Sequence, residues 1–568
     1  MPCPCELASP RGSSAFQSHL ALLHHGFDKH ALIDLALPLE EWKVLLTDEN
    51  LAETSIHTRA KMLFVAAHGF EVLSPGEAIP LTSRPNHPSV RSGTSNIDVG
   101  IIDAEIQKLI TKGWVVPWAT VALENPGTPH PKISPLGAVA KKDSLEPRII
   151  FDLSSPKGSA VNDFSVPPPF HYPSIDTASE FILPGSWMAK LDLKSGFHSV
   201  PLHPSSYRWL GFRWDRTEYV YKVLPFGLAT SPWIFCEFTS FICATLRHRL
   251  LLLWTKESRT SRVPFAVVYV DDFLIIGDST KDVWAAIHIL ELLIATLGFT
   301  NNVSKFVPPS QCLSFLGIEL DSIAMTARMP EDKVTQLRSE LLRVSKREKM
   351  TKRELQSILG VMNFAAKVVK GGRTWMRALI DLTTTVASQR HFVRITSNAK
   401  SELRWWRTLL VKFNSRPFTA SLLKGGLAEV FTDASLTGGG GFWDGDYFRC
   451  TWTPRDLALG EHINVLELRT ILLAARKWGH KWVNRSVVIR SDNSATVGAI
   501  NNSTSRSYQM TRILQELFFI AVKFNFSITC VHVPGVDNDL ADALSRWHEP
   551  DAEARFEYAL NVWRSSQI

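Results

Sequence analysis

From residue 426 onward, apolar and polar positions follow the periods of a compact α/β unit. Short apolar runs bounded by turn residues predict strands, and longer stretches with apolar residues three and four positions apart predict helices. The glycine run 438–441 fits a tight hairpin. The predicted strands cover residues 428–432, 440–443, 487–490 and 527–533, and the predicted helices cover residues 465–478 and 509–522.

The pattern before residue 426 changes twice. Over residues 96–325, helical segments alternate with short apolar strands, whereas residues 326–425 are mainly helical and basic. Apolar side chains at helical spacing within the basic segment predict a buried helix face. These side chains are Leu355, Ile358, Leu359, Met362 and Ala366.

The two ends of the chain carry little chemical information. Residues 1–95 form an extension of unknown role, with helical patterns around 32–46 and 51–67 followed by several prolines. Residues 547–568 form a short tail. We therefore expect an α/β multidomain protein with segments at 1–95, 96–325, 326–425, 426–546 and 547–568.

Length and composition exclude few classes of protein. A chain of 568 residues needs more than one hydrophobic core, and 45% apolar with 21% charged residues is an ordinary globular balance. The net charge of +7 only weakly favours a polyanionic partner. Seven scattered cysteines, no signal segment and no long apolar run predict an intracellular protein with reduced thiols and no membrane partner.

Three aspartates are the first candidates for chemistry. Asp271 and Asp272 interrupt an apolar run at 265–276 that reads as a β-hairpin, and Asp192 ends a short predicted strand upstream. Adjacent carboxylates repel each other beside buried strands, and a magnesium or manganese ion would relieve that repulsion. An ordinary acidic turn is the alternative for the pair alone. Three carboxylates from neighbouring strands suit two-metal phosphoryl transfer.

The box Tyr269-Val-Asp-Asp272 resembles the catalytic motif of reverse transcriptases, and Asp192 falls where that family has its other metal-binding acid. The resemblance implies a right-hand polymerase, with fingers and palm in residues 96–325 and a thumb or connection in residues 326–425. It implies that an RNA template is copied into DNA from a DNA primer and dNTPs. Two Mg²⁺ or Mn²⁺ ions would be held by the three aspartates.

Further segments match this family in chain order. Lys141 and Arg148 lie where the fingers hairpin clamps the phosphates of the incoming nucleotide, and Phe197 matches the bulky gate that excludes a ribose 2′-hydroxyl. Core packing is the alternative for Phe197. Gly227 lies in a segment that resembles the part of the family under the template base and nucleotide. Phe226 departs from many retroviral enzymes, which carry glutamine there.

The basic segment at 326–425 has two interpretations. A charge-rich helix surface is usually a solvated face, but after a polymerase palm it resembles a thumb that tracks the phosphates of the hybrid. The basic residues concerned are Lys333, Arg338, Arg343, Lys346, Arg347, Lys349, Lys352, Arg353, Lys367, Lys370 and Arg373.

A second set of acids follows from residue 426. Asp433 directly follows the first predicted strand, Glu467 is near the start of a helix, Asp492 is at the end of a strand, and Asp542 comes after a strand and turn. Any one of them alone would be an ordinary cap or surface charge. Together, in this order, they resemble the metal-binding acids of ribonuclease H.

The resemblance to ribonuclease H implies an RNase H-like α/β domain at 426–546 that binds two Mg²⁺ or Mn²⁺ ions and cleaves the RNA strand of an RNA-DNA hybrid. The short loop between Gly535 and Asp542 lacks the histidine that relatives carry there to aid product release. His532 lies on the preceding strand, where a structural role is expected.

The resemblance to retrotransposon reverse transcriptases covers residues from about 100 to 546. Residues 353–360 and 371–375 look most like the DIRS-like elements, which integrate with a tyrosine recombinase; LTR retrotransposons are next. We see no protease box or integrase zinc site, so a separate recombinase or integrase is expected. Two alternatives are a decayed copy that only binds nucleic acid, disfavoured by seven intact acids, and an RNA-copying polymerase, disfavoured by Phe197 and the attached nuclease.

Overall fold

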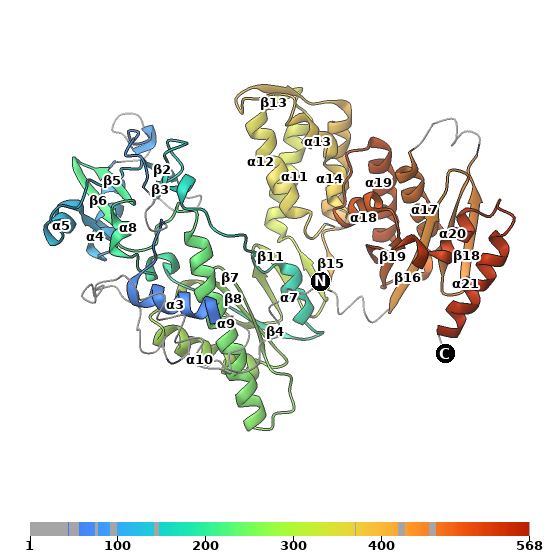
Figure 1. Cartoon of the computed structure of the whole chain (residues 1–568), viewed down its shortest axis with the longest axis horizontal. Helices are drawn as coiled ribbons and strands as arrows, with labels where there is room; N and C mark the ends of the chain where they lie inside the picture. The colour runs from blue at the N-terminus through green and yellow to red at the C-terminus, as the bar shows by residue number, and fades with distance from the viewer. Residues whose placement is uncertain are drawn as a thin grey trace. The chain divides into compact units, whose positions relative to one another are not determined.

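The computed structural model describes residues 44, 56–73, 78–90, 99–140, 147–369, 371–418, 426–453 and 462–566. These residues belong to two compact units (Figure 1), one formed by residues 1–178 with 187–310 and the other by residues 179–186 with 311–568. Lys141 and nearly all of the helix predicted at 32–46 lie outside the described residues. In the part of the chain that the structure describes, no helix is long and apolar enough to cross a membrane.

The first unit is built around a four-stranded antiparallel sheet in the order β7-β8-β4-β9. The predicted hairpin at 265–276 is confirmed as β7 and β8, and the predicted strand that ends in Asp192 is β4. Alternate side chains of β4, β7 and β8 share one buried cluster with helices α9 and α10. The bounds are β4 Trp187–Asp192, β7 Phe265–Tyr269, β8 Asp272–Gly277, β9 Val307–Ser310, α9 Ser231–Lys256 and α10 Thr280–Thr296.

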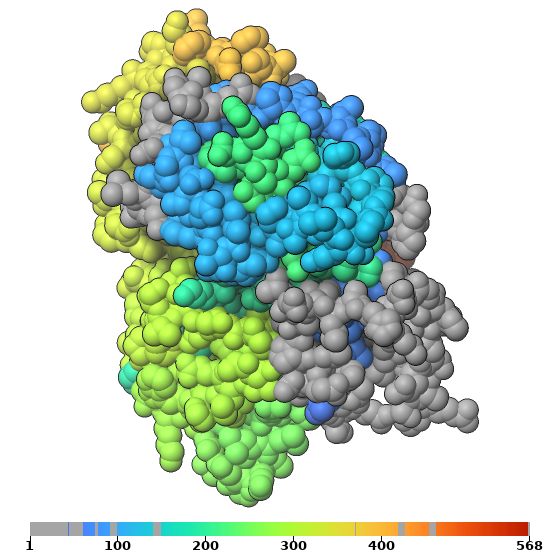
Figure 2. Space-filling view, turned by 90° about the vertical axis from the view of Figure 1, so that its left-hand side faces the viewer, coloured from blue at the N-terminus to red at the C-terminus, as the bar shows by residue number. Residues whose placement is uncertain are grey.

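The first unit also has a three-stranded sheet in the order β1-β6-β5 and the hairpin β2–β3. Strands β1, β2 and β3 precede β4 in the chain, and β5 and β6 lie between β4 and β7. Figure 2 shows the blue to cyan segments that contain β1 and the green hairpin β5–β6 side by side on one face, as their strand pairing requires. The bounds are α4 Val99–Thr111, β1 Val115–Pro117, α5 Trp118–Glu124, β2 Leu136–Ala140, β3 Pro147–Phe151, β5 Gly211–Trp214 and β6 Thr217–Tyr221.

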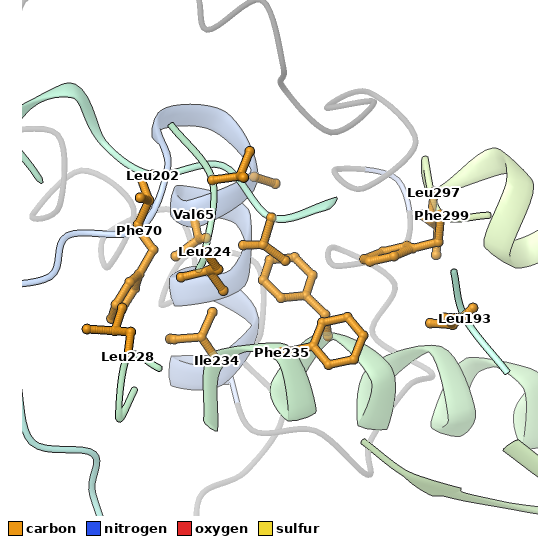
Figure 3. Close-up of a cluster of buried hydrophobic side chains, with 14 of the residues drawn as sticks. Val65, Phe70, Leu193, Leu202, Leu224, Leu228, Ile234, Phe235, Leu297 and Phe299 are labelled. Carbon is orange, nitrogen blue, oxygen red and sulfur yellow. The ribbon is translucent and has the colours of Figure 1, made fainter. Parts of the chain in front are cut away.

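Part of the N-terminal extension is integral to this unit. Helix α3, Ile56–His68, lies against the start of α9, and Val65 and Phe70 join the buried cluster around Ile234 and Phe235 (Figure 3). Residues 78–90 then run along the hairpin β2–β3, where the Asn86 side chain accepts a hydrogen bond from the backbone N–H of Leu136. The extension therefore contributes to the core of the first unit, which the sequence pattern did not predict.

The second unit begins with a sheet in the order β10-β11-β12-β15 followed by packed helices. Four of the five residues of the predicted helix face are buried on α12: Leu355, Ile358, Leu359 and Met362. The fifth, Ala366, is the half-buried residue just after the helix, and Ala365 is buried in its place. Its start is fixed by a capping box, because Thr351 accepts from the backbone N–H of Glu354 and the Glu354 side chain accepts from that of Thr351. The bounds are β10 Cys312–Phe315, β11 Ile318–Asp321, β12 Thr326–Arg328, α11 Glu331–Ser345, α12 Lys352–Ala365, α13 Arg377–Leu382, α14 Ser397–Lys412 and β15 Arg416–Pro417.

The same unit ends in a five-stranded sheet in the order β18-β17-β16-β19-β20. The first three strands along the chain pair antiparallel, and β16, β19 and β20 are parallel. All four predicted strands and both predicted helices of this region are present. The bounds are β16 Leu427–Ala434, β17 Gly438–Trp443, β18 Asp446–Thr451, α17 Ile463–Trp478, β19 Ser486–Ser491, α18 Ser494–Asn501, α19 Tyr508–Lys523, β20 Ser527–His532, α20 Asp539–Ser545 and α21 Ala552–Ser566.

Two details of this last domain differ from the sequence prediction. The glycines at 438–441 form the start of strand β17, and the turn precedes them. Glycine is needed in this strand because a Cβ at Gly440 would lie 2.3 Å from the Cβ of Leu544 on α20. Most of the tail at 547–568 is helix α21, whose Phe556 and Trp563 pack with Phe442 of β17. The close approach of α20 therefore explains the glycines that the local pattern assigned to a turn. The apolar face of α21 explains the helix in the segment that the pattern assigned to a tail.

Candidate active sites

The three aspartates of the palm meet at the ends of adjacent strands. Asp192 is the last residue of β4 and pairs in register with Asp272, the first residue of β8. Asp271 lies in the two-residue turn after Tyr269. The preceding Val270 has φ 57, a conformation that β-branched residues rarely adopt, so the turn is strained where it carries Asp271.

Lysine and amide side chains contact these carboxylates. Asp192 is buried, and its oxygens accept hydrogen bonds from Asn302 Nδ2 at 2.9 Å and from Lys305 Nζ at 2.9 and 3.2 Å. Lys190 Nζ lies 3.0 Å from Asp272 Oδ1. Hydrogen bonding to Asp192 raises the pKa of Lys305, and burial, followed by the charge of Asp192, raises the pKa of Asp271. This strand end is therefore a concentrated negative site balanced by two ammonium groups.

The predicted nucleotide-binding residues are partly described. Phe197, half-buried in the short helix after β4, lies with its ring 5.0 Å from that of Phe226, which is 55% exposed. A Cβ at Gly227, where φ is 100, would lie 2.2 Å from the carbonyl oxygen of Phe151. Arg148 is on β3, and the segment with Lys141 lies outside the described residues. Gly227 therefore permits a close backbone approach that any side chain would block.

Three of the four acids in the last domain converge. Asp433 on β16, Glu467 on α17 and Asp492 just after β19 each offer a carboxylate oxygen, and these oxygens all lie within 4.8 Å of one another. Among the described residues this is the one such cluster. It lines a cavity of about 470 Å³ with Ser435, Arg546 and His548 among the other lining residues.

Burial makes this cluster costly without a cation. It raises the pKa of Glu467 to about 9, with the charges of Asp433 and Asp492 adding to the effect, and it raises the pKa of Asp433 to about 6. Glu467 Oε2 is buried without a hydrogen-bond partner, and Asp433 Oδ2 accepts from Ser545 Oγ. A buried, unsatisfied carboxylate oxygen beside two other acids fits a divalent cation with oxygen ligands.

Asp542 lies apart from the converging oxygens. It is on α20, and its two oxygens accept hydrogen bonds from Arg546 Nε at 2.7 Å and from Arg555 Nη1 at 3.2 Å. It is not among the residues that line the described cavity. The structure therefore brings together Asp433, Glu467 and Asp492 and leaves Asp542 in an ion-paired position.

Sequence reasoning missed several residues around both sites. Lys190 is two positions before Asp192, so it leaves the same pleated strand on the same face, and this spacing would have signalled it. Arg555 and His548 carry no local signal, because their proximity to the site depends on how α21 and the turn before it pack. His532 is exposed at the end of β20.

Solved structures with a similar fold are polymerases. The foamy viral protease-reverse transcriptase dRH in complex with ds DNA aligns with a TM-score of 0.52 at 16% identity, over 89% of this chain and 84% of that one. A second structure of the foamy viral protease-reverse transcriptase, with dsDNA, gives a TM-score of 0.51 at 16% identity, over 87% of this chain and 97% of that one. The expected fold class is therefore confirmed: fingers, palm and thumb followed by an RNase H-like α/β domain.

One family model matches part of the first unit and the start of the second. Residues 163–320 match the family model described as "Reverse transcriptase (RNA-dependent DNA polymerase)". The chain thus carries a reverse transcriptase domain, and Asp192, Asp271 and Asp272 lie within it.

Two curated relatives come from viruses. Protein P of heron hepatitis B virus is 24% identical over 303 residues, which are 52% of this chain and 35% of the relative. Polyprotein P3 of Commelina yellow mottle virus is 21% identical over 397 residues, 66% of this chain and 19% of the relative. The chain spans about a third or less of the length of these relatives. They support homology to viral and retroelement polymerases.

Proposed function

We propose that this chain is an RNA-directed DNA polymerase of a retrotransposon that also degrades the RNA strand of RNA-DNA hybrids. One observation carries the polymerase part: Asp192 and Asp272 pair in register, with Asp271 in the adjoining turn, inside the matched reverse transcriptase domain. The three-acid cluster at the head of a separate sheet carries the nuclease part.

At the polymerase site, Asp192, Asp271 and Asp272 would hold two magnesium or manganese ions. Bound there, the ions would favour ionisation of the primer 3′-hydroxyl and neutralise the triphosphate of the incoming dNTP. Asn302 and Lys305 orient the carboxylate of Asp192, and Lys190 balances the charge of Asp272. Lys141 and Arg148 bind the nucleotide phosphates, and Gly227 lets the backbone approach the nucleotide.

Phe197 sets the sugar preference. Its ring stands against Phe226 and Phe235, which fixes its position near the strand end that carries Asp192. A bulky, immobile ring there excludes a ribose 2′-hydroxyl and admits dNTPs.

At the nuclease site, Asp433, Glu467 and Asp492 would hold one divalent cation, and Asp542 would contribute to a second. Bound there, the ions would supply a nucleophilic water at neutral pH and stabilise the leaving oxygen. Ser545 orients Asp433, and the cavity admits a phosphodiester of the hybrid.

The natural partners follow from these activities. The chain binds an RNA template, a DNA primer, dNTPs and the RNA-DNA hybrid it produces, and it acts with a recombinase or integrase supplied by another polypeptide. We assign the retrotransposon to the DIRS-like elements on residues 353–360 and 371–375.

The test is extension of a DNA primer on an RNA template whose 5′ end is labelled, with and without magnesium. Magnesium-dependent extension accompanied by shortening of the RNA is expected. Binding of the hybrid without either reaction, in magnesium and in manganese, would instead show a protein that binds nucleic acid without catalysis.

A further inference from the structure

Asp542 is held by two arginines from different parts of the chain. Arg546 follows α20 by one residue and donates Nε–H to Asp542 Oδ1 at 2.7 Å, whereas Arg555 comes from α21 and donates from Nη1 to Oδ2 at 3.2 Å. Both oxygens of this carboxylate are therefore engaged by guanidinium groups, and we call Arg546 and Arg555 the arginine clamp.

The two arms of the clamp are held differently. Arg555 also contacts Glu549 at 2.7 Å and Asp551 at 3.3 Å, so three carboxylates fix its guanidinium. Arg546 has Asp542 as its close partner, since its contact to Glu549 is 3.9 Å long. Arg555 is therefore an anchor, and Arg546 is the arm that exchanges partners more easily.

Arg546 also faces the place where substrate would enter. It lines the cavity together with Asp433, Glu467 and Asp492, whereas Asp542 is not among the lining residues described. Arg546 thus both bonds the fourth acid and lines the space that a phosphodiester would occupy. A guanidinium forms charge-assisted hydrogen bonds with phosphate as it does with carboxylate.

We propose that the arginine clamp holds Asp542 away from the three-acid cluster, so that the free nuclease site binds one divalent cation, and that a substrate phosphate draws Arg546 from Asp542 and completes a second cation site. This inference rests on the proposed nuclease function and deepens it. Arg546 and Arg555 are positioning residues, which act on the site through Asp542.

Helix α21 supplies Arg555, one of the two arginines of the clamp. The helix packs by Phe556 and Trp563 beside α20 (Figure 1), and this packing delivers Arg555 to Asp542. The segment after residue 546 therefore takes part in assembly of the site.

The test counts bound Mn²⁺ by electron paramagnetic resonance, on the full chain with Asp192→Asn and Asp271→Asn so that the polymerase site does not contribute. This parent is expected to bind one ion at the nuclease site. Arg546→Gln is expected to bind two, and Arg546→Gln combined with Asp542→Asn is expected to return to one. The matched control is Arg564→Gln on the exposed face of α21, which is expected to stay at one.

The nucleic-acid arm uses a hybrid whose RNA strand is 2′-O-methylated and resists cleavage. With this hybrid, the parent is expected to bind one ion more than the parent that also carries Asp542→Asn. Because both samples contain the hybrid, the difference excludes ions bound to the hybrid itself. Arg555→Gln, checked for helix content by circular dichroism, is expected to match Arg546→Gln.

The outcomes separate two kinds of failure. If the parent and Arg546→Gln both bind one ion, the clamp proposal is overturned and the nuclease assignment stands. The same conclusion follows if the parent already binds two ions without the hybrid. A parent that binds no ion, with Glu467→Gln without effect, would overturn the nuclease assignment and the clamp together.

Discussion

Protonation of Glu467 should limit cation binding at the nuclease site. The side chain is 3% exposed, and burial beside Asp433 and Asp492 raises its pKa to about 9. A carboxylate must be ionised to bind a cation, so affinity is expected to rise as the pH rises toward 9. At pH 7, two units below that value, about 1% of Glu467 is ionised, and cation binding is weaker by about 2.7 kcal/mol, or ~100-fold, than above pH 9.

The dependence of the cation association constant on pH is expected to steepen at lower pH. Burial raises the pKa of Asp433 to about 6, so below that pH Asp433 is protonated as well as Glu467. The association constant is therefore expected to change about tenfold per pH unit between pH 6 and 9, and more steeply below pH 6. Binding near pH 7 should release about one proton per ion.

The assay is isothermal titration with Mg²⁺ or Mn²⁺ at several pH values, in two buffers of different ionisation enthalpy, on the chain carrying Asp192→Asn and Asp271→Asn. Glu467→Gln is the matched variant, and it should bind the ion weakly and lose the slope between pH 7 and 9. An affinity that is flat over this range, with no proton release, would refute the coupling of burial to cation binding.

Three further predictions concern the polymerase unit and the thumb. Phe197→Ala should admit ribonucleotides, measured as the ratio of kcat/KM for rNTP to that for dNTP, and an unchanged ratio would remove the gate assignment. Gly227→Ala should destabilise the polymerase unit by ~2 kcal/mol or more, because its Cβ would lie 2.2 Å from Phe151 O; the control Gly360→Ala, with nothing within 4 Å, should be neutral or stabilising in the same urea titration. Thr351→Ala should cost about 1 kcal/mol by loss of the α12 cap, and an unchanged urea midpoint would show that the cap contributes nothing.

Local pattern located most of the chemistry, because acids at strand ends have a local signal. The hairpin with Asp271 and Asp272 needs only two apolar runs around a turn, and the structure has it at the predicted place. Convergence of Asp433, Glu467 and Asp492 was suggested by chain order and by resemblance to ribonuclease H, and the pairing of β16 with β19 brings them together.

What the sequence did not reveal depends on tertiary packing. Glycines 438–441 looked like a turn because glycine is typical of turns, but here they make room for Leu544 and for Phe448. Arg555 reaches Asp542 only because α21 packs on this domain, and Lys132 is fully buried only because residues 78–90 supply carbonyl partners. Such contacts join segments far apart in the chain, which local periodicity does not encode.

The most direct test of the account compares two single variants in one reaction that reports both activities. In magnesium, with a DNA primer on an end-labelled RNA template, Asp271→Asn should lose primer extension yet still cleave a preformed hybrid, and Glu467→Gln should extend the primer yet leave the RNA intact. This outcome follows from two sites with separate carboxylates. Loss of both activities in a folded Asp271→Asn chain, or RNA cleavage at the parent rate by Glu467→Gln, would contradict it.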